Sequence, residues 1–156
     1  MPKRSAGLLL HRQGEDGREV LLVHPGGPFF AKKDLGVWSI PKGEYEEGDD
    51  PLASALREFE EETGTALEGE GAIELGSVVQ RAGKVVSAWA LEGDLDAAAI
   101  RSNTFTMQWP PRSGRTAEFP EVDRAEWFAI EEAKRRLVPA QAELVDRLVE
   151  ALSDGP

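Results

Sequence analysis

The amino-acid sequence predicts an α+β fold, and three observations support this prediction. Short apolar segments with strand composition fill much of the chain, and a few segments have helical periodicity. Strands and helices also do not alternate as they would in a Rossmann fold. Because 156 residues suffice for one core, we expect a single domain over residues 1–156.

The first part of the chain predicts a β-hairpin. Residues 4–11 and 19–24 are apolar, and the polar turn 13–17 separates them. A third apolar segment, residues 37–40, predicts a short strand that ends at Pro41.

A helix at about residues 50–63 has clear start and stop signals. Asp50 is suited to the N-cap, and Pro51 fits the first helical position. Apolar residues then recur at helical spacing, which predicts one buried stripe. Gly64 is placed to end the helix in a left-handed conformation.

The rest of the chain alternates apolar segments with turn signals. These segments predict a second hairpin, two further strands, a basic loop and two C-terminal helices. Their ranges are 72–80 with 85–91 for the hairpin, 103–109 and 125–130 for the strands, 110–115 for the loop, and 131–137 and 140–152 for the helices.

The composition excludes several classes of function. Cysteine is absent, which rules out disulfides, thiolate metal sites and cysteine nucleophiles. Apolar runs are too short to span a membrane, so we expect no membrane partner and a cytoplasmic location. The net charge of −11 argues against nucleic-acid binding through a broad basic surface, so no nucleic-acid partner is expected.

Three carboxylates lie close together near the end of the predicted helix. At 100° per residue, Glu58 and Glu62 project within about 40° of each other, and Glu61 lies beside them. Like charges at this spacing repel unless a cation lies among them, and carboxylate oxygens are typical ligands of Mg²⁺ or Mn²⁺. The alternative is a solvated acidic helix face.

The segment from Gly43 to Thr65 resembles the Nudix box, G-x5-E-x7-R-E-U-x-E-E-x-G-U with U apolar. Six identities fall in register, together with the apolar Phe59; they are Gly43, Arg57, Glu58, Glu61, Glu62 and Gly64. Chance agreement of this kind has a probability on the order of 10⁻⁵ to 10⁻⁴, which favours the metal site over the solvated face. Asp49 and Thr65 depart from the pattern.

This resemblance implies a Nudix-type α/β/α sandwich with a mixed sheet and hydrolysis of a substituted nucleoside diphosphate. It implies that Glu58 and Glu62 hold the metal, with Glu61 as ligand or base and the Gly43 carbonyl as a further ligand. Arg57 is then expected to orient a glutamate through a bidentate pair. The shorter Asp49 carboxylate affects geometry rather than activity.

Basic residues are candidates for binding the phosphate chain. The Trp38–Gly43 segment resembles the W-x-x-P-K-G segment of Nudix enzymes that cleave dinucleoside or inositol polyphosphates, which places Lys42 near phosphate. A core position for Trp38 is the alternative. Two basic loops contribute further candidate contacts, or are simply solvated; their cations are Lys32, Lys33, Arg112 and Arg115.

Two later acids, Glu118 and Glu121, are candidates for an additional base or metal ligand, because several Nudix enzymes use an acid from this region. The leading hypothesis is a metal-dependent pyrophosphohydrolase whose small-molecule substrate is a nucleoside polyphosphate, such as diadenosine tetraphosphate. A nucleoside triphosphate or nucleotide-sugar pyrophosphatase is the first alternative. A non-catalytic nucleotide sensor is the second, and both monomer and homodimer remain open.

Overall fold

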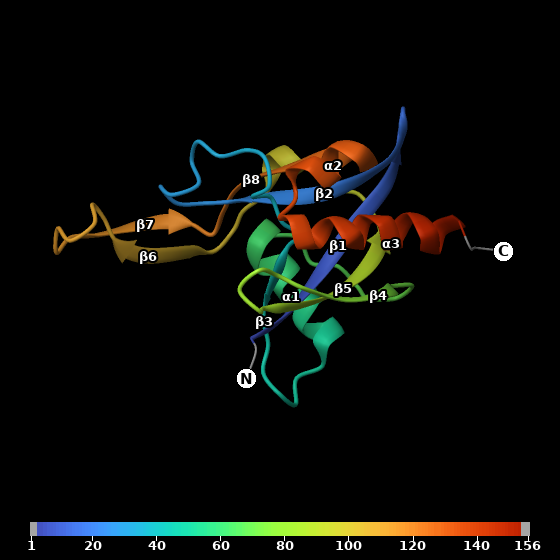
Figure 1. Cartoon of the computed structure of the whole chain (residues 1–156), viewed down its shortest axis with the longest axis horizontal. Coiled ribbons are helices and arrows are strands. Elements are labelled where there is room, and N and C mark those ends of the chain that lie inside the picture. The colour runs from blue at the N-terminus through green and yellow to red at the C-terminus, as the bar shows by residue number, and fades with distance from the viewer. Residues whose placement is uncertain (1–2, 154–156) are drawn as a thin grey trace.

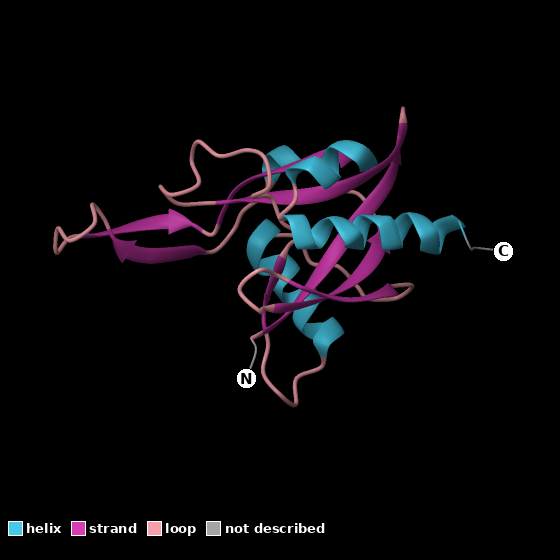
Figure 2. Cartoon of the chain, viewed as in Figure 1, coloured by secondary structure: helices cyan, strands magenta, loops and turns pink. Residues whose placement is uncertain are grey.

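The computed structural model describes residues 3–153, and a mixed β-sheet between helices forms its body (Figures 1 and 2). The strands are β1 (Arg4–Gly14), β2 (Gly17–Pro25), β3 (Lys42–Glu44), β4 (Ile73–Val79), β5 (Val85–Glu92), β6 (Thr104–Gln108), β7 (Thr116–Pro120) and β8 (Val122–Ala129). The α-helices are α1 (Pro51–Thr63), α2 (Ile130–Arg136) and α3 (Ala142–Ser153), and short 3-10 turns are η1 (Ala97–Ala99) and η2 (Pro139–Gln141).

Six strands form the main sheet in the order β4-β5-β1-β2-β8, with β3 paired to β1. The central pair β1–β5 is parallel, whereas β1–β2, β1–β3, β4–β5 and β2–β8 are antiparallel. The predicted mixed sheet and α+β class are therefore confirmed, as are both predicted hairpins.

Two apolar cores lie on opposite faces of this sheet. Alternation along β1 directs Leu9 to one face and Leu8 and Leu10 to the other. Helices α2 and α3 cover the Leu9 face, and α1 covers the Leu8 face through Phe59. The central strand is apolar on both sides because both of its faces are buried.

The predicted strand at residues 37–40 is wrong. These residues make only isolated bridges, from Ser39 to Val23 and from Trp38 to Leu137. The continuous pairing with β1 begins farther along the chain, in β3. The apolar character that predicted a strand belongs to a loop whose Trp38 and Ile40 side chains are fully buried.

Strands β6 and β7 form a separate hairpin that extends from the body (Figure 1, left). The prediction of a strand at 103–109 is confirmed, whereas the sequence did not indicate β7. The predicted basic loop is the turn of this hairpin. We call residues 104–120 the arm.

The C-terminal helices and the last strand lie close to their predicted bounds. Between residues 3 and 153, none of the helices combines the length and hydrophobicity that a membrane crossing requires.

Candidate active site

The caps of α1 position its acidic turn. The Ala53 N–H donates to the Asp50 side chain at 3.0 Å, and Pro51 begins the helix. Gly64 ends it with φ 81°, which glycine adopts without strain. Burial of Phe59 against the sheet fixes the rotation of the helix, so the flanking glutamates point away from the core.

Gly43 and Glu58 are in close contact. Strand β3 pairs Gly43 with Ala6 of β1, and α1 packs beside this strand. A Cβ atom at Gly43 would collide with the Glu58 carboxylate, so only glycine leaves space for this carboxylate. Burial raises the pKa of Glu58, and the neighbouring charge of Glu61 raises it further.

Glu62 lies beside Lys42, the residue that precedes Gly43 in the chain. The Lys42 backbone N–H donates weakly to Glu62 Oε1 at 3.4 Å. Burial raises the pKa of Glu62 to about 8, although the Lys42 charge opposes this shift. Burial also lowers the pKa of Lys42 to about 8, with a contribution from the charge of Lys84.

Arg57 lies on the exposed side of the same cluster. Its Nη2 is 3.5 Å from Glu58 Oε1, a single contact rather than the expected bidentate pair. The side chain is half exposed, so the pair is weak as it stands. Arg57 is nevertheless the arginine that forms an ion pair with the acidic turn.

The donor set fits a hard divalent cation in its chemistry. Glu58 and Glu62 are partly buried carboxylates whose pKa values are raised, chiefly by burial. Oxygen donors of this kind suit Mg²⁺ or Mn²⁺. Between residues 3 and 153, however, no three acidic or histidine side chains are gathered as around a bound ion. Binding would therefore require these side chains to change rotamer.

The structure separates the two later acids. Glu121 lies close enough to raise the pKa of Glu62 through its charge. Its backbone N–H donates to the Asn103 carbonyl at 2.8 Å, which holds it beside the end of α1. Glu118 is instead an exposed residue of β7, opposite Thr106 in the arm. Glu121 thus remains a candidate at the site, and Glu118 lies outside it.

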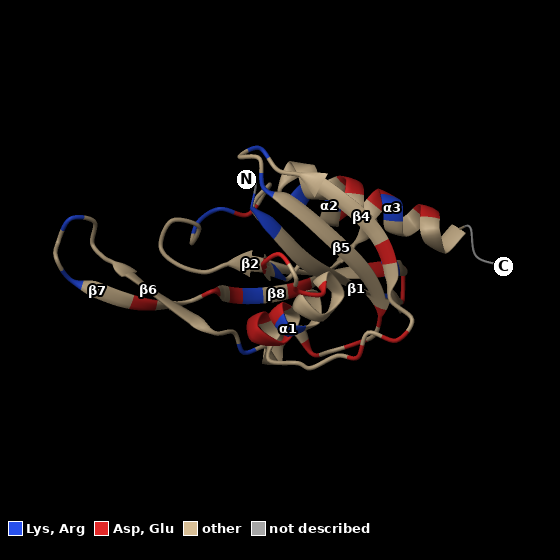
Figure 3. Cartoon of the chain, turned by 90° about the horizontal axis from the view of Figure 1, so that it is seen from below, with Lys and Arg blue, Asp and Glu red and all other residues tan. Residues whose placement is uncertain are grey.

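The predicted phosphate-binding cations occupy three places. Lys42 is next to Glu62, as described above. Lys32 and Lys33 lie exposed in the loop that follows β2, and Arg112 and Arg115 lie at the turn of the arm. In Figure 3, acidic residues gather on α1 and basic residues lie at the end of the arm.

Trp38 belongs to the core. Its side chain is fully buried, with its ring edge-on to Phe128 and its indole N–H donating to Asp34 at 3.0 Å. The core alternative for this residue is therefore correct. His24 is also structural, since it is buried between Asp123 and the Lys33 carbonyl, at 2.8 and 2.7 Å.

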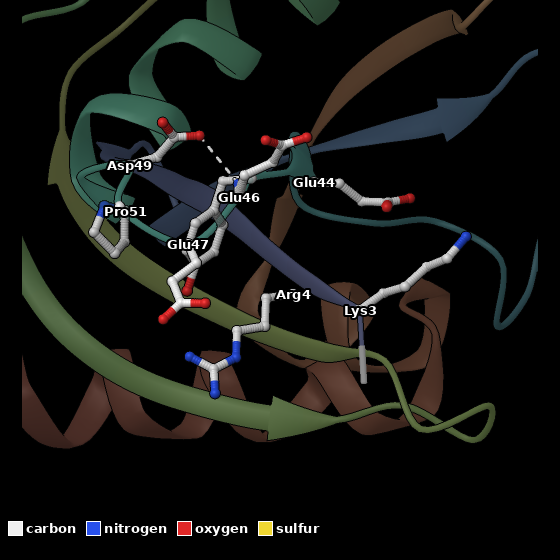
Figure 4. A pocket seen from close by; sticks show the side chains of 9 residues that line it. Lys3, Arg4, Glu44, Glu46, Glu47, Asp49 and Pro51 are labelled. Atoms are coloured by element: carbon white, nitrogen blue, oxygen red, sulfur yellow. Dashed lines mark hydrogen bonds between the residues drawn. The ribbon is translucent and has the colours of Figure 1, made fainter. Parts of the chain in front are cut away.

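Asp49, which replaces the first box glutamate, lies apart from the acidic turn. Its carboxylate accepts from the Glu46 N–H at 3.0 Å and stabilises the loop before α1 (Figure 4). This loop and the start of β1 surround a hollow of about 450 Å³ lined by Lys3, Arg4, residues 44–49 and Pro51. The hydrogen bond from the Glu46 N–H therefore gives Asp49 a structural role in closing this loop.

Sequence reasoning missed Arg101 and Asn103. Both line a hollow of about 400 Å³ beside Arg57 and Glu61. The Asn103 N–H donates to the Glu61 carbonyl at 2.8 Å, and Arg101 packs against Gly64. The segment has no periodicity or motif that would have indicated this position; only the fold brings it to α1.

Comparisons with known proteins identify the family and the fold. The NUDIX domain family model matches residues 1–148. An RNA pyrophosphohydrolase of Brucella anthropi is 28% identical over 151 residues, which cover 86% of this chain and 78% of that protein.

Solved structures share the fold. A C. elegans Ap4A hydrolase binary complex superposes with a TM-score of 0.69 at 21% identity, covering 97% of this chain and 99% of that chain. The NUDIX domain of Shewanella oneidensis NrtR, complexed with ADP ribose, has a TM-score of 0.66 at 17% identity, covering 97% and 89%. The family model and the sequence relatives confirm the predicted family resemblance and the pyrophosphohydrolase class, and the solved structures confirm the fold.

Proposed function

Because this chain belongs to the Nudix family, we propose that it cleaves a phosphoanhydride bond in a nucleoside polyphosphate with the help of Mg²⁺ or Mn²⁺. The observation that carries this proposal is the contact of Glu58 with Gly43, next to the partly buried Glu62. A solvated acidic face would not bury two carboxylates, because burial of uncompensated charge is costly. We also propose that residues 1–156 act as one catalytic domain.

In the proposed mechanism, Glu58 and Glu62 would hold the cation, with the Gly43 carbonyl as a further ligand. A bound divalent cation neutralises phosphate oxygens and lowers the pKa of an attacking water. Glu61, which lies beside Glu58, or Glu121, which lies beside Glu62, would act as the base for the attacking water. Lys42 would bind a phosphate oxygen from beside Glu62, and Arg57 would keep Glu58 oriented.

Two substrate classes are supported by different observations. The Trp38–Gly43 segment favours a dinucleoside polyphosphate such as diadenosine tetraphosphate. The relationship to an RNA pyrophosphohydrolase favours the 5′-polyphosphate end of an RNA. A nucleoside triphosphate or a nucleotide sugar is the simpler alternative within the same chemistry.

The test is product-resolved hydrolysis of a nucleotide panel with Mg²⁺ and with Mn²⁺. The panel contains dinucleoside polyphosphates, nucleoside triphosphates, nucleotide sugars and a 5′-triphosphorylated oligonucleotide. We expect metal-dependent cleavage of at least one class, and a dinucleoside polyphosphate would yield two nucleotides. Nucleotide binding without turnover across the panel would instead support a non-catalytic sensor.

A further inference from the structure

Aromatic and cationic side chains concentrate in two segments next to the site, the arm and loop 26–35. These segments contain five of the eleven aromatic residues of the chain, namely Phe29, Phe30, Phe105, Trp109 and Phe119. Their four cations and two acids give a local charge of +2, opposite in sign to the −11 of the whole chain. A polyanion that the rest of the surface repels is therefore attracted here.

Loop 26–35 follows the arm from its base toward its end. At the base, the Gly26 N–H donates to the Glu121 carbonyl at 2.9 Å, and the Gly27 backbone lies against the Phe105 ring. Farther out, the Phe29 and Trp109 rings meet edge to face, with centroids 5.6 Å apart. Phe29 is 58% exposed, so much of its ring is available to a ligand.

The base of the arm is attached to the catalytic helix. Asn103, immediately before β6, donates its N–H to the Glu61 carbonyl at 2.8 Å. Glu121, immediately after β7, donates its own N–H to Asn103 at the same distance. A ligand whose polyphosphate lies at the acidic turn therefore meets the arm directly.

The length of the arm favours an oligonucleotide over a mononucleotide as its ligand. Five strand residues at about 3.4 Å each extend roughly 17 Å, and Arg112 and Arg115 lie at the far end. A mononucleotide at α1 leaves this end uncontacted. A single-stranded oligonucleotide reaches it, because such chains carry a phosphate at every nucleotide and bind to grooves that combine aromatic rings with cations.

We propose that the arm and loop 26–35 bind a single-stranded oligonucleotide whose 5′-polyphosphate end lies at Glu58 and Glu62. Bases stack on Phe29, and the phosphates pair with Arg112 and Arg115. This inference rests on the proposed function, since it takes the acidic turn as the place of the phosphoanhydride. It departs from the expectation of no nucleic-acid partner, which the −11 charge supported for binding through a broad basic surface but not through a local one.

The test measures binding of a fluorescein-labelled decaribonucleotide with a 5′-hydroxyl group, which contains no bond for the enzyme to cleave. By fluorescence anisotropy, Phe29→Ala weakens binding roughly tenfold, the change expected from losing one stacked base, whereas Phe29→Trp retains it. Arg112→Gln with Arg115→Gln lowers the slope of log affinity against log salt by about 1.4. The control Arg81→Gln, an exposed arginine at the β4–β5 turn, binds like the wild type.

Several outcomes would overturn the inference. No binding by the wild type, or equal affinity of Phe29→Ala and Arg81→Gln, would show that the arm does not hold the oligonucleotide. A dimer that buries Phe29, without oligonucleotide binding, would assign the surface to a second copy of the chain. Hydrolysis of the nucleotide panel, including the 5′-triphosphorylated oligonucleotide, is measured in parallel. Oligonucleotide binding without any hydrolysis refutes the proposed function and the placement of the 5′ end at Glu58 and Glu62, whereas binding at the arm stands.

Discussion

Helix α1 and the arm meet at one point of the molecule and differ in almost every other respect. The helix packs Phe59 into a core and carries the carboxylates of the proposed metal site on its last turns. The arm extends away from the sheet, and its aromatic face is covered in part by a single loop. The difference suggests a division of labour in which the buried element performs the reaction and the projecting element chooses the ligand.

The largest effect is expected from Glu58→Gln. This substitution removes a charge from the proposed metal site without changing the volume of the side chain. Turnover of the preferred nucleotide is therefore expected to fall by roughly three or more orders of magnitude. Circular dichroism remains like that of the wild type. The control is Glu74→Gln on exposed β4, which keeps full turnover; retained turnover in Glu58→Gln would remove this residue from the mechanism.

The next largest effect concerns Gly43→Ala. The added methyl group displaces the Glu58 carboxylate, and a misplacement of about 1 Å costs on the order of 10²-fold in rate. Gly83→Ala, at a turn with φ 88° and open space around it, is the control that strains the backbone elsewhere. Steady-state kinetics separates the two, because only Gly43→Ala changes kcat.

The sequence predicted α1 well because its signals are local. Asp50, Pro51 and Gly64 act within one turn of the helix, and their order along the chain suffices to define both ends. The box acids are likewise neighbours in sequence, so their shared position needed no knowledge of the fold.

Elements that depend on distant pairing were harder to predict. Strand β3 exists because residues 42–44 pair with residues 5–7, and nothing near Lys42 encodes this partner. Strand β7 is short, half exposed and interrupted by polar residues, so it is defined only by its pairing with β6. The positions of Arg101, Asn103 and Glu121 beside α1 have the same origin.

The pH dependence of stability is a smaller test of the buried site. The pKa of Glu62 rises from an ordinary 4.5 to about 8 on folding, so the folded protein binds this proton more tightly than the unfolded chain does. In metal-free protein, the contribution of Glu62 to the free energy of unfolding is therefore greatest below about pH 4.5. This contribution falls by roughly 2–5 kcal/mol as the pH rises to 8.

Urea denaturation of metal-free protein between pH 5 and 8 measures this slope. Glu62→Gln flattens it, and Glu74→Gln leaves it unchanged. Added Mg²⁺ reverses the trend, because a cation favours the ionised carboxylates. An equally steep slope in Glu62→Gln would show that another group is responsible.

The smallest expected effect is that of Asp50→Ala. Loss of the cap to the Ala53 N–H lowers the free energy of unfolding by about 1 kcal/mol, which corresponds to a Tm decrease of about 2–4 °C. Differential scanning calorimetry measures this change. An unchanged Tm would indicate that core packing alone, through Phe59, defines the start of α1.

The most direct test of this account is whether the carboxylates of α1 bind the metal ion. Electron paramagnetic resonance can measure Mn²⁺ binding to the wild type and to Glu58→Gln. The side chains of Glu58, Glu61 and Glu62 must gather around an ion for the proposed chemistry to operate. We predict saturable Mn²⁺ binding by the wild type, and a Kd that is roughly tenfold or more higher in Glu58→Gln. Equal binding by the two proteins would contradict the account and place the metal elsewhere.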